Sequence, residues 1–309
     1  MIKKRTLGRT GLELSEIGFG CASYWGKKSF NEKRAIRLVE IATEKGVNFF
    51  DTGYSYSAGN AEIRLGKALK LLPNKEKIII SSKAGTRITK SGRYITDLDP
   101  NWVKKSIDLS LTNIGIDHLP LFQLHGPSVK DLENQELLKL ISDLKTSGKV
   151  GFLGVNTYES DVIEKILDLD IFDFVMIDYN VLMQHREPVI DRLYKKGIGV
   201  MAGSALANSL FSNRVFKIKG VKDLWYLARA LKNHRGALLR GRSLHFINNL
   251  PGISGSQAAL SYVLNNQQVT TAVFGSTTKK HVIENLESGG IELPKELIKR
   301  IQRSASKCA

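Results

Sequence analysis

The chain has 309 residues, of which 42% are hydrophobic and 25% are charged, and its formal net charge is +16. This composition is typical of a globular protein and excludes a chain that is disordered throughout. No run approaches the ~18 consecutive apolar residues of a membrane helix, and no apolar core follows the basic N-terminus as in a secretory signal. Cys21 and Cys308 lie far apart without metal-ligand spacing, so we expect no disulfide framework, no metal site and a cytoplasmic location.

Short β-branched or apolar runs alternate with amphipathic stretches along almost the whole chain. The pattern first predicts a hairpin over residues 4–14 that turns at residues 8–11. Eight strands are predicted after it, at residues 16–21, 47–51, 78–83, 119–125, 151–156, 174–179, 197–202 and 271–275. Helices are predicted between them, at residues 33–45, 102–114, 131–147, 161–169 and 187–196, with Pro100 and Pro188 near helix starts.

Eight repeats of strand and helix without linker-like composition predict an α/β fold, a (β/α)8 TIM barrel that forms a single domain over residues 1–309. The alternative is an open, doubly wound sheet. The glycines Gly18 and Gly20 lack the third glycine of a dinucleotide-binding fingerprint, because position 23 is serine. A Tyr-x-x-x-Lys pair occurs as Tyr24 and Lys28, near the start of the chain rather than on a helix in its middle. Both observations favour the barrel.

Several predicted strands change from apolar to polar residues where they end, and barrel strands carry functional side chains at that end. We therefore expect Asp51, Lys83 and His125 to meet at one mouth, together with Tyr54 or Tyr56. Each residue alone also has a structural explanation, such as a helix cap or a core histidine. As a set they suit proton transfer to a carbonyl oxygen, because an ammonium lowers the pKa of a phenol, a carboxylate keeps that ammonium charged, and a neutral imidazole orients the substrate.

Ordered motifs run through the chain. They are residues 14–20, 50–56, 61–62, 65–69, 82–83, 123–125, 148–150, 153–155, 179–180 and 284–286. In this order they resemble the aldo-keto reductase family over nearly the whole length. The resemblance implies a barrel with a hairpin at its bottom, a nicotinamide cofactor, and interconversion of an aldehyde, ketone or sugar carbonyl with its alcohol. It also implies a catalytic tetrad of Asp51, Tyr56, Lys83 and His125, with Tyr54 as the second candidate for the tyrosine.

The same resemblance implies a set of cofactor-binding positions. They are Gly20, Cys21, Asp51, Asn156, Thr157, Met176, Gly203, Ser204, Leu206, Gly275, Ser276, Thr277, Lys280, His281, Glu284 and Asn285. Serine and threonine hydroxyls followed by lysines at a helix N-terminus form an anion site, which suits the 2′-phosphate of NADP(H). We therefore expect NADP(H) in preference to NAD(H), although His281 stands where the family commonly has arginine.

Several cofactor positions depart from the family pattern. Asn156-Thr157 replaces Ser-Asn, Met176 replaces a glutamine, and Gly203 replaces the aromatic residue that stacks on nicotinamide. Loss of that ring removes ~0.5–1.5 kcal/mol of binding. The aromatic residues that are candidates to compensate are Tyr24, Trp25, Tyr158 and Tyr179. For the substrate we expect contacts with Tyr24, Trp25 and His125.

A basic insertion follows the seventh strand of the barrel. Residues 214–242 hold nine basic residues and one acidic residue, a net charge of +8. One interpretation is a lid helix whose leucines pack on the barrel. The other is a phosphate clamp, in which Arg235, Arg240 and Arg242 meet the cofactor or an anionic substrate. Nucleic-acid binding is disfavoured because no recognised motif accompanies the charge.

A different class of function is also open. The barrel could bind nucleotide mainly as a regulatory or scaffolding subunit with little turnover. The complete tetrad argues against this alternative, whereas Met176 and Gly203 keep it open.

Overall fold

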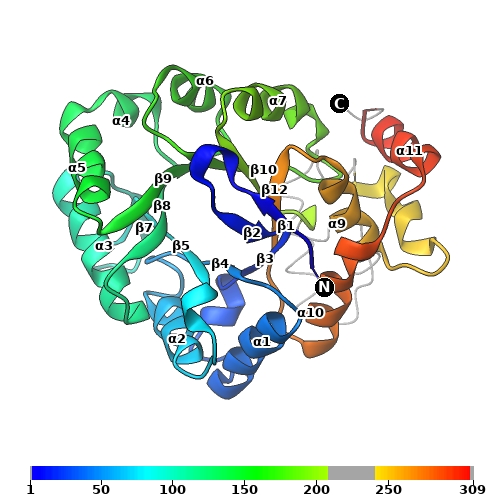
Figure 1. Cartoon of the computed structure of the whole chain (residues 1–309), viewed down its shortest axis with the longest axis horizontal. Coiled ribbons are helices and arrows are strands. Elements are labelled where there is room, and N and C mark those ends of the chain that lie inside the picture. Colours follow the sequence, from blue (N-terminus) through cyan, green and yellow to red (C-terminus); the bar gives the residue numbers. More distant parts are fainter. Residues whose placement is uncertain (1, 208–240, 307–309) are drawn as a thin grey trace.

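The computed structural model describes residues 2–207 and 241–306. Eight parallel strands close into a barrel in the order β10-β11-β12-β3-β4-β5-β8-β9, which confirms the predicted TIM barrel (Figure 1). The strands are β3 Ile17–Gly20, β4 Phe49–Asp51, β5 Ile79–Ala84, β8 Leu119–His125, β9 Val150–Asn156, β10 Phe174–Asp178, β11 Gly199–Gly203 and β12 Val269–Phe274. Each of the eight predicted strands is present, because continuous apolar runs report burial on both faces.

Helices surround the barrel and cover its outer face (Figure 1). They are α1 Glu32–Glu44, α2 Asn60–Leu69, α3 Pro100–Ile114, α4 Val129–Glu133, α5 Gln135–Thr146, α6 Ser160–Asp168, α7 Glu187–Lys195, α9 Gly255–Asn265, α10 Lys279–Leu286 and α11 Lys295–Ser306. Short 3₁₀ turns are η1 Gly8–Thr10, η2 Ser23–Gly26, η3 Lys75–Lys77, η4 Gln184–Arg186, η7 His245–Asn249 and η8 Glu287–Gly290. The single helix predicted at residues 131–147 is wrong: Asn134 ends α4, and its side chain accepts hydrogen bonds from two backbone N–H groups that begin α5.

The predicted N-terminal hairpin is present and seals one end of the barrel. Strands β1 Lys4–Thr6 and β2 Glu13–Ser15 pair antiparallel. Leu7 and Leu14 are fully buried and join an apolar cluster inside the barrel that includes Phe49 and Phe174. At Gly8, which has φ +49°, a Cβ atom would lie 2.4 Å from the backbone oxygen of Gly197, just before β11. This close approach places the hairpin at the N-terminal ends of the strands, away from the polar strand ends.

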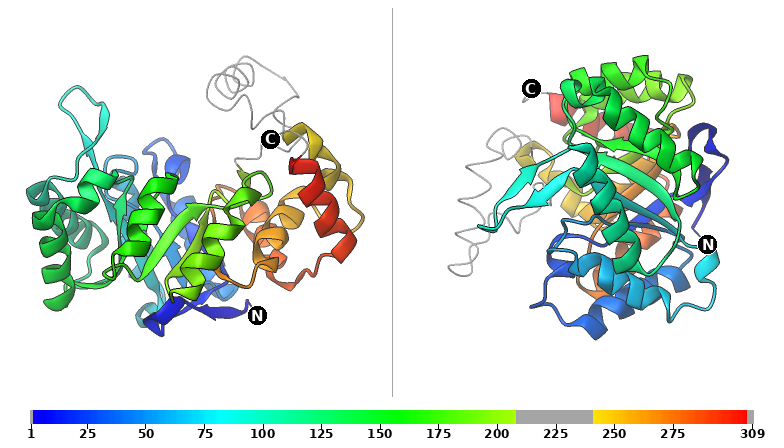
Figure 2. Two further views of the ribbon diagram at one scale, coloured as in Figure 1. Left: turned by 90° about the horizontal axis from the view of Figure 1, so that it is seen from above. Right: turned by 90° about the vertical axis from the view of Figure 1, so that its left-hand side faces the viewer.

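A second hairpin, which the sequence did not indicate to us, rises from the opposite end (Figure 2). It follows β5 directly and pairs β6 Thr86–Ile88 with β7 Tyr94–Thr96. Its strands have three residues each, and Tyr94 is 58% exposed, so no buried face creates a periodic apolar signal. The hairpin stands next to the polar ends of β5 and β8.

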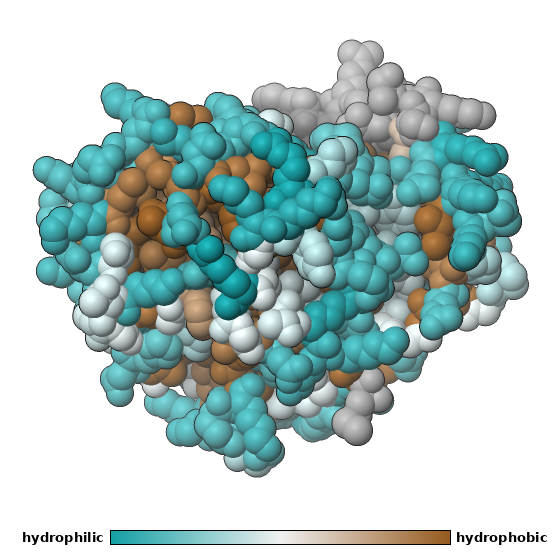
Figure 3. All heavy atoms as spheres, turned by 45° about the horizontal axis from the view of Figure 1, so that its top comes forward, coloured by the Kyte–Doolittle hydropathy of each residue, from teal (hydrophilic) through white to brown (hydrophobic). Residues whose placement is uncertain are grey.

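Most of the basic insertion, including the residues expected to form a lid helix or a clamp up to Arg240, lies outside the described residues. The described part resumes at Gly241, and Arg242 is exposed there. Across residues 2–207 and 241–306, none of the helices has both the length and the apolar character needed to cross a bilayer. The face shown in Figure 3 is mostly hydrophilic, with apolar side chains visible in recesses between polar ones.

Candidate active site

The polar ends of three neighbouring strands meet at the mouth opposite the N-terminal hairpin. Asp51 ends β4, Lys83 lies near the end of β5, and His125 ends β8. Strand β5 pairs with both β4 and β8, so Asp51 aligns with Ser81 and Lys83 aligns with Gln123. The barrel therefore brings together residues that are widely separated in the sequence.

Lys83 and Asp51 form a buried ion pair. The Lys83 ammonium donates to both carboxylate oxygens of Asp51, at 2.5 and 2.6 Å, and to the backbone oxygen of Thr52 at 2.9 Å. The two side chains are only 1% and 7% exposed. Burial acts to lower the pKa of Lys83, but Asp51 and the Tyr56 hydroxyl together outweigh it and the pKa is raised. The amine is therefore held in its charged form.

Gln123 completes the support of this pair, and we did not single it out from the sequence as a site residue. Its amide nitrogen donates to Asp51 Oδ1 at 3.2 Å and to Ser81 Oγ at 2.5 Å. Gln123 is fully buried. It holds one carboxylate oxygen of Asp51 in place while Lys83 contacts both.

The structure distinguishes between the two candidate tyrosines. The Tyr56 ring has the Lys83 ammonium 5.3 Å from its centroid and the His125 ring edge-on at 6.1 Å. Tyr54 instead packs its ring against Trp102, with centroids 5.8 Å apart. The geometry therefore places Tyr56, and not Tyr54, beside the charged lysine and the imidazole.

The net shift of the Tyr56 pKa differs from our expectation. Burial raises the pKa of Tyr56, while Lys83 lowers it through its charge and a hydrogen bond, and burial is the larger effect. The prediction that the pKa of this tyrosine is lowered is therefore wrong. The phenol is in its protonated form at neutral pH, which is the form that donates a proton.

His125 is a neutral imidazole. Burial and the positive charge of Lys83 together lower its pKa to about 4. Its Nδ1 atom lies 3.2 Å from the hydroxyl oxygen of Thr86, the first residue of β6. The second hairpin thus reaches one side of the imidazole.

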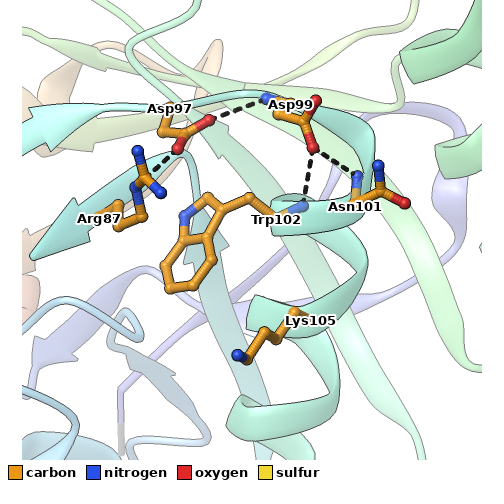
Figure 4. Close-up of a pocket in the computed structure, with 6 residues that line it drawn as sticks. All are labelled: Arg87, Asp97, Asp99, Asn101, Trp102 and Lys105. Carbon is orange, nitrogen blue, oxygen red and sulfur yellow. Dashed lines mark hydrogen bonds and ion pairs between the residues drawn. The ribbon is translucent and has the colours of Figure 1, made fainter.

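The second hairpin is braced against the start of α3 (Figure 4). Arg87 forms an ion pair with Asp97 at 2.8 Å, and its guanidinium lies 5.9 Å from the centroid of the Trp102 ring. Asp97 accepts from the backbone N–H of Asp99, whose own carboxylate caps α3. With Asn101 and Lys105, these residues line a hollow of about 500 Å³.

The predicted nicotinamide-side positions lie around the ends of β9, β10 and β11. Asn156 aligns with Met176, and Gly203 aligns with Asp178. A Cβ atom on Gly203 would lie 3.4 Å from Met176 Cγ, an ordinary contact distance, so no backbone requirement explains the glycine. Thr157 is buried, and its hydroxyl accepts from the backbone N–H of Glu159.

The strand end at Gly203 continues into a tight turn. Ser204 has φ +47°, and its backbone oxygen accepts from the Asn180 amide. Leu206 is partly buried and packs against the main core. The backbone at Ser204 is therefore in the left-handed region, at the mouth of the barrel.

Further predicted cofactor positions lie around the ends of β3 and β12. Gly20 aligns with Asp51, and the Cys21 N–H donates to the backbone oxygen of Asp51 at 2.7 Å. Gly275 follows β12, and a Cβ atom there would lie 3.3 Å from the Gly20 oxygen. Cys21 itself is fully buried, and burial raises the pKa of its thiol.

Helix α10 presents its N-terminus on the same side of the barrel. Thr278 caps the helix by accepting from the His281 N–H, after the partly buried Ser276 and Thr277. Lys280 and His281 are exposed there. Asn285 is 3% exposed, and its amide oxygen has no partner among the described residues. An adenine amino group is a donor of the kind that this oxygen lacks, and Glu284 lies beside it, so these residues fit an adenine dinucleotide.

The expected aromatic residues divide into two groups. Trp25 is 1% exposed with its indole N–H bonded to the Ala35 oxygen, and Tyr179 is 1% exposed with its hydroxyl bonded to Glu187. Both belong to the core, so the structure does not bring Trp25 to a substrate surface. Tyr24 and Tyr158 are about half exposed, at 50% and 51%. Burial raises the pKa of the Tyr158 hydroxyl, and the charge of Asp178 adds to this shift.

Comparisons with known proteins agree with this geometry. The model of the "Aldo/keto reductase family" matches residues 16–306. The chain belongs to the aldo/keto reductase family. Members of this family are NAD(P)H-dependent oxidoreductases that act on small carbonyl compounds.

Individual family members are similar over almost their whole length. The chain is 29% identical to L-galactose dehydrogenase of Arabidopsis thaliana over 300 residues, covering 92% of this chain and 87% of that protein. It is 24% identical to NADH-specific methylglyoxal reductase of Escherichia coli, covering 94% of this chain and 95% of that protein. The holo structure of aldo-keto reductase AKR11C1 from Bacillus halodurans superposes with a TM-score of 0.80 at 25% identity, covering 98% and 96% of the two chains.

Proposed function

We propose that this aldo/keto reductase interconverts an aldehyde, ketone or sugar carbonyl with the corresponding alcohol, with Tyr56 as the proton donor. One observation supports the proposal above all others. The buried Lys83 ammonium forms an ion pair with Asp51 and lies beside the ring of Tyr56, and His125 is on the neighbouring strand. This is the arrangement that proton delivery to a carbonyl oxygen requires.

Each of the four side chains has a distinct task. Neutral His125 donates a hydrogen bond to the carbonyl oxygen and orients it. Tyr56 transfers its hydroxyl proton to that oxygen, and Lys83 stabilises the phenolate that remains. Asp51, held by Gln123, keeps Lys83 charged and directed toward the phenol. The reduced nicotinamide, when bound, supplies the hydride that the carbonyl carbon accepts.

The residues proposed to hold the cofactor lie on or just after six barrel strands and around the start of α10. Asn156, Thr157, Met176 and Gly203 would contact the nicotinamide side, and the half-exposed Tyr158, two residues after β9, remains a candidate to stack on the ring. Ser276, Thr277 and Lys280 at the start of α10 would bind a 2′-phosphate, which supports NADP(H) over NAD(H). The methylglyoxal reductase relative is described as NADH-specific, so the preference calls for direct measurement.

The test is turnover by a Tyr56→Phe variant. We expect at least a ~10²-fold loss of kcat for NADPH-dependent reduction, because the phenolic proton is gone. NADPH affinity, followed by fluorescence titration, should stay close to that of the wild-type protein. Tyr54→Phe is the matched control and should keep most of its activity. Loss of turnover in Tyr54→Phe with retention in Tyr56→Phe would overturn the assignment.

The same measurements separate the enzyme from a regulatory or scaffolding subunit. Such a subunit would bind NADPH and yet reduce none of a panel of aldehydes, ketones and aldoses. The names of the relatives make L-galactose and methylglyoxal suitable members of that panel.

A further inference from the structure

The imidazole of His125 has one described hydrogen-bond partner, and it comes from the second hairpin. Thr86 Oγ1 lies 3.2 Å from Nδ1 of His125. Within the described residues, no hydrogen bond is found for Nε2. The nitrogen that would face a substrate is therefore the one that Thr86 does not contact.

The hairpin backbone approaches His125 closely at the same place. Gly85 has φ +120°, and a Cβ atom on it would lie 3.0 Å from the His125 backbone oxygen. Its own oxygen accepts from the Asp97 N–H at 2.9 Å, which closes the base of the hairpin. The Arg87–Asp97 ion pair and the cap of α3 add further anchors on the outer side (Figure 4). Thr86 is thus held in place by the contacts of the residues before and after it, Gly85 and Arg87.

The contact between Thr86 and Nδ1 has two possible directions. If Nδ1 carried the hydrogen, the hydroxyl hydrogen of Thr86 would have no acceptor among the described residues, and the lone pair of Nε2 would face the carbonyl oxygen. If Thr86 donates, its hydrogen is satisfied, and Nε2 carries the hydrogen that a carbonyl oxygen accepts. Only the second direction gives the carbonyl oxygen a hydrogen-bond donor, and it also pairs the hydroxyl hydrogen of Thr86 with Nδ1. The positive charge of Lys83 also opposes a second proton on the ring.

We propose that Thr86 is a positioning residue that donates its hydroxyl hydrogen to Nδ1 of His125, and so holds the imidazole in the tautomer with hydrogen on Nε2. The proposal deepens the proposed function, since it rests on His125 as the residue that orients the substrate oxygen. It assigns a role in the reaction to a hairpin that contributes none of the four tetrad residues.

Kinetics of matched threonine variants give the first test. Thr86→Val keeps the β-branched shape but removes the hydroxyl, so we expect kcat to fall about tenfold, with little change in cofactor affinity. Thr86→Ser restores a hydroxyl and should return kcat to within about twofold of wild type. Thr96→Val is the control, because Thr96 lies directly opposite Thr86 in the hairpin and is exposed. Equal activity of Thr86→Val and Thr96→Val would overturn the proposal.

The second test observes the tautomer itself. Nitrogen-15 NMR of histidine-labelled protein distinguishes a ring nitrogen that carries hydrogen from one that does not, and His125→Asn assigns the signal. We expect hydrogen on Nε2 in the wild-type protein and in Thr86→Ser, and a mixture of tautomers in Thr86→Val. Hydrogen on Nδ1 in the wild-type protein, or an unchanged spectrum in Thr86→Val, would contradict the proposal. Full turnover by His125→Asn would contradict the proposed function instead.

Discussion

Removal of the carboxylate of Asp51 should destabilise the fold as well as the reaction. Asp51→Asn leaves the Lys83 ammonium, whose side chain is 1% exposed, without its counter-ion. Breaking a buried pair by removing one partner costs about 3–5 kcal/mol. The asparagine oxygen and the Thr52 oxygen still accept hydrogen bonds from Lys83. We therefore expect the free energy of unfolding to fall by about 3 kcal/mol, the low end of that range.

The double variant Asp51→Asn/Lys83→Met is the matched control. It contains no unpaired buried charge, so its free energy of unfolding should lie within about 1 kcal/mol of the wild-type value. Urea unfolding at neutral pH measures both differences from the midpoints, provided that the slope is constant. The ion-pair argument would be refuted if the free energy of unfolding fell in the double variant by the sum of the losses measured for Asp51→Asn and Lys83→Met alone. Such additivity is what two independent sites give.

The pH dependence of the single variant supplies a second check. Without Asp51, burial is left as the main influence and lowers the pKa of Lys83. At a pH between this lowered value and the ordinary lysine pKa of ~10.4, Lys83 is protonated in the unfolded chain and neutral in the folded chain. The stability deficit of Asp51→Asn should therefore shrink as the pH rises toward that value. A deficit that is constant with pH would mean that Lys83 stays charged without its partner.

Two further predictions follow from the mouth of the barrel and from α10. The pKa of His125 is lowered from 6.5 to about 4, so the unfolded chain protonates this histidine first as the pH falls. Relative to His125→Asn, the wild-type protein should lose about 2 kcal/mol of unfolding free energy between neutral pH and about pH 4.5, and parallel pH curves in urea unfolding would contradict this. Lys280→Ala should raise the KM for NADPH about fivefold and leave the KM for NADH unchanged, because it removes a cation from the proposed phosphate site. Equal changes for both cofactors in steady-state kinetics would argue against a 2′-phosphate contact.

The chain's local patterns were sufficient for the architecture. Each buried parallel strand is a continuous apolar run, so the eight barrel strands could be located without any knowledge of their neighbours. The break between α4 and α5 was missed because Asn134 interrupts a stretch whose apolar spacing continues across it. The β6–β7 hairpin was missed because its short strands bury no face.

The placement of Trp25 could not be predicted from the sequence either. Trp25 was expected to contact the substrate, but its indole ring is buried and its N–H donates to the Ala35 oxygen on α1. A side chain in an irregular segment can turn toward the core or toward the mouth, and sequence spacing does not distinguish the two.

The sequence by itself determined which residues stand at the ends of barrel strands, because strand periodicity is a local property of the chain. That was enough to name Asp51, Lys83 and His125 as neighbours. Only the tertiary structure showed that Tyr56 and not Tyr54 lies beside Lys83 and that burial outweighs the ammonium in setting the Tyr56 pKa. The contacts of Thr86 with His125 and of Gln123 with Asp51 were likewise visible only there. These outcomes depend on strand register and on exclusion of water, which are set by residues far away in the sequence.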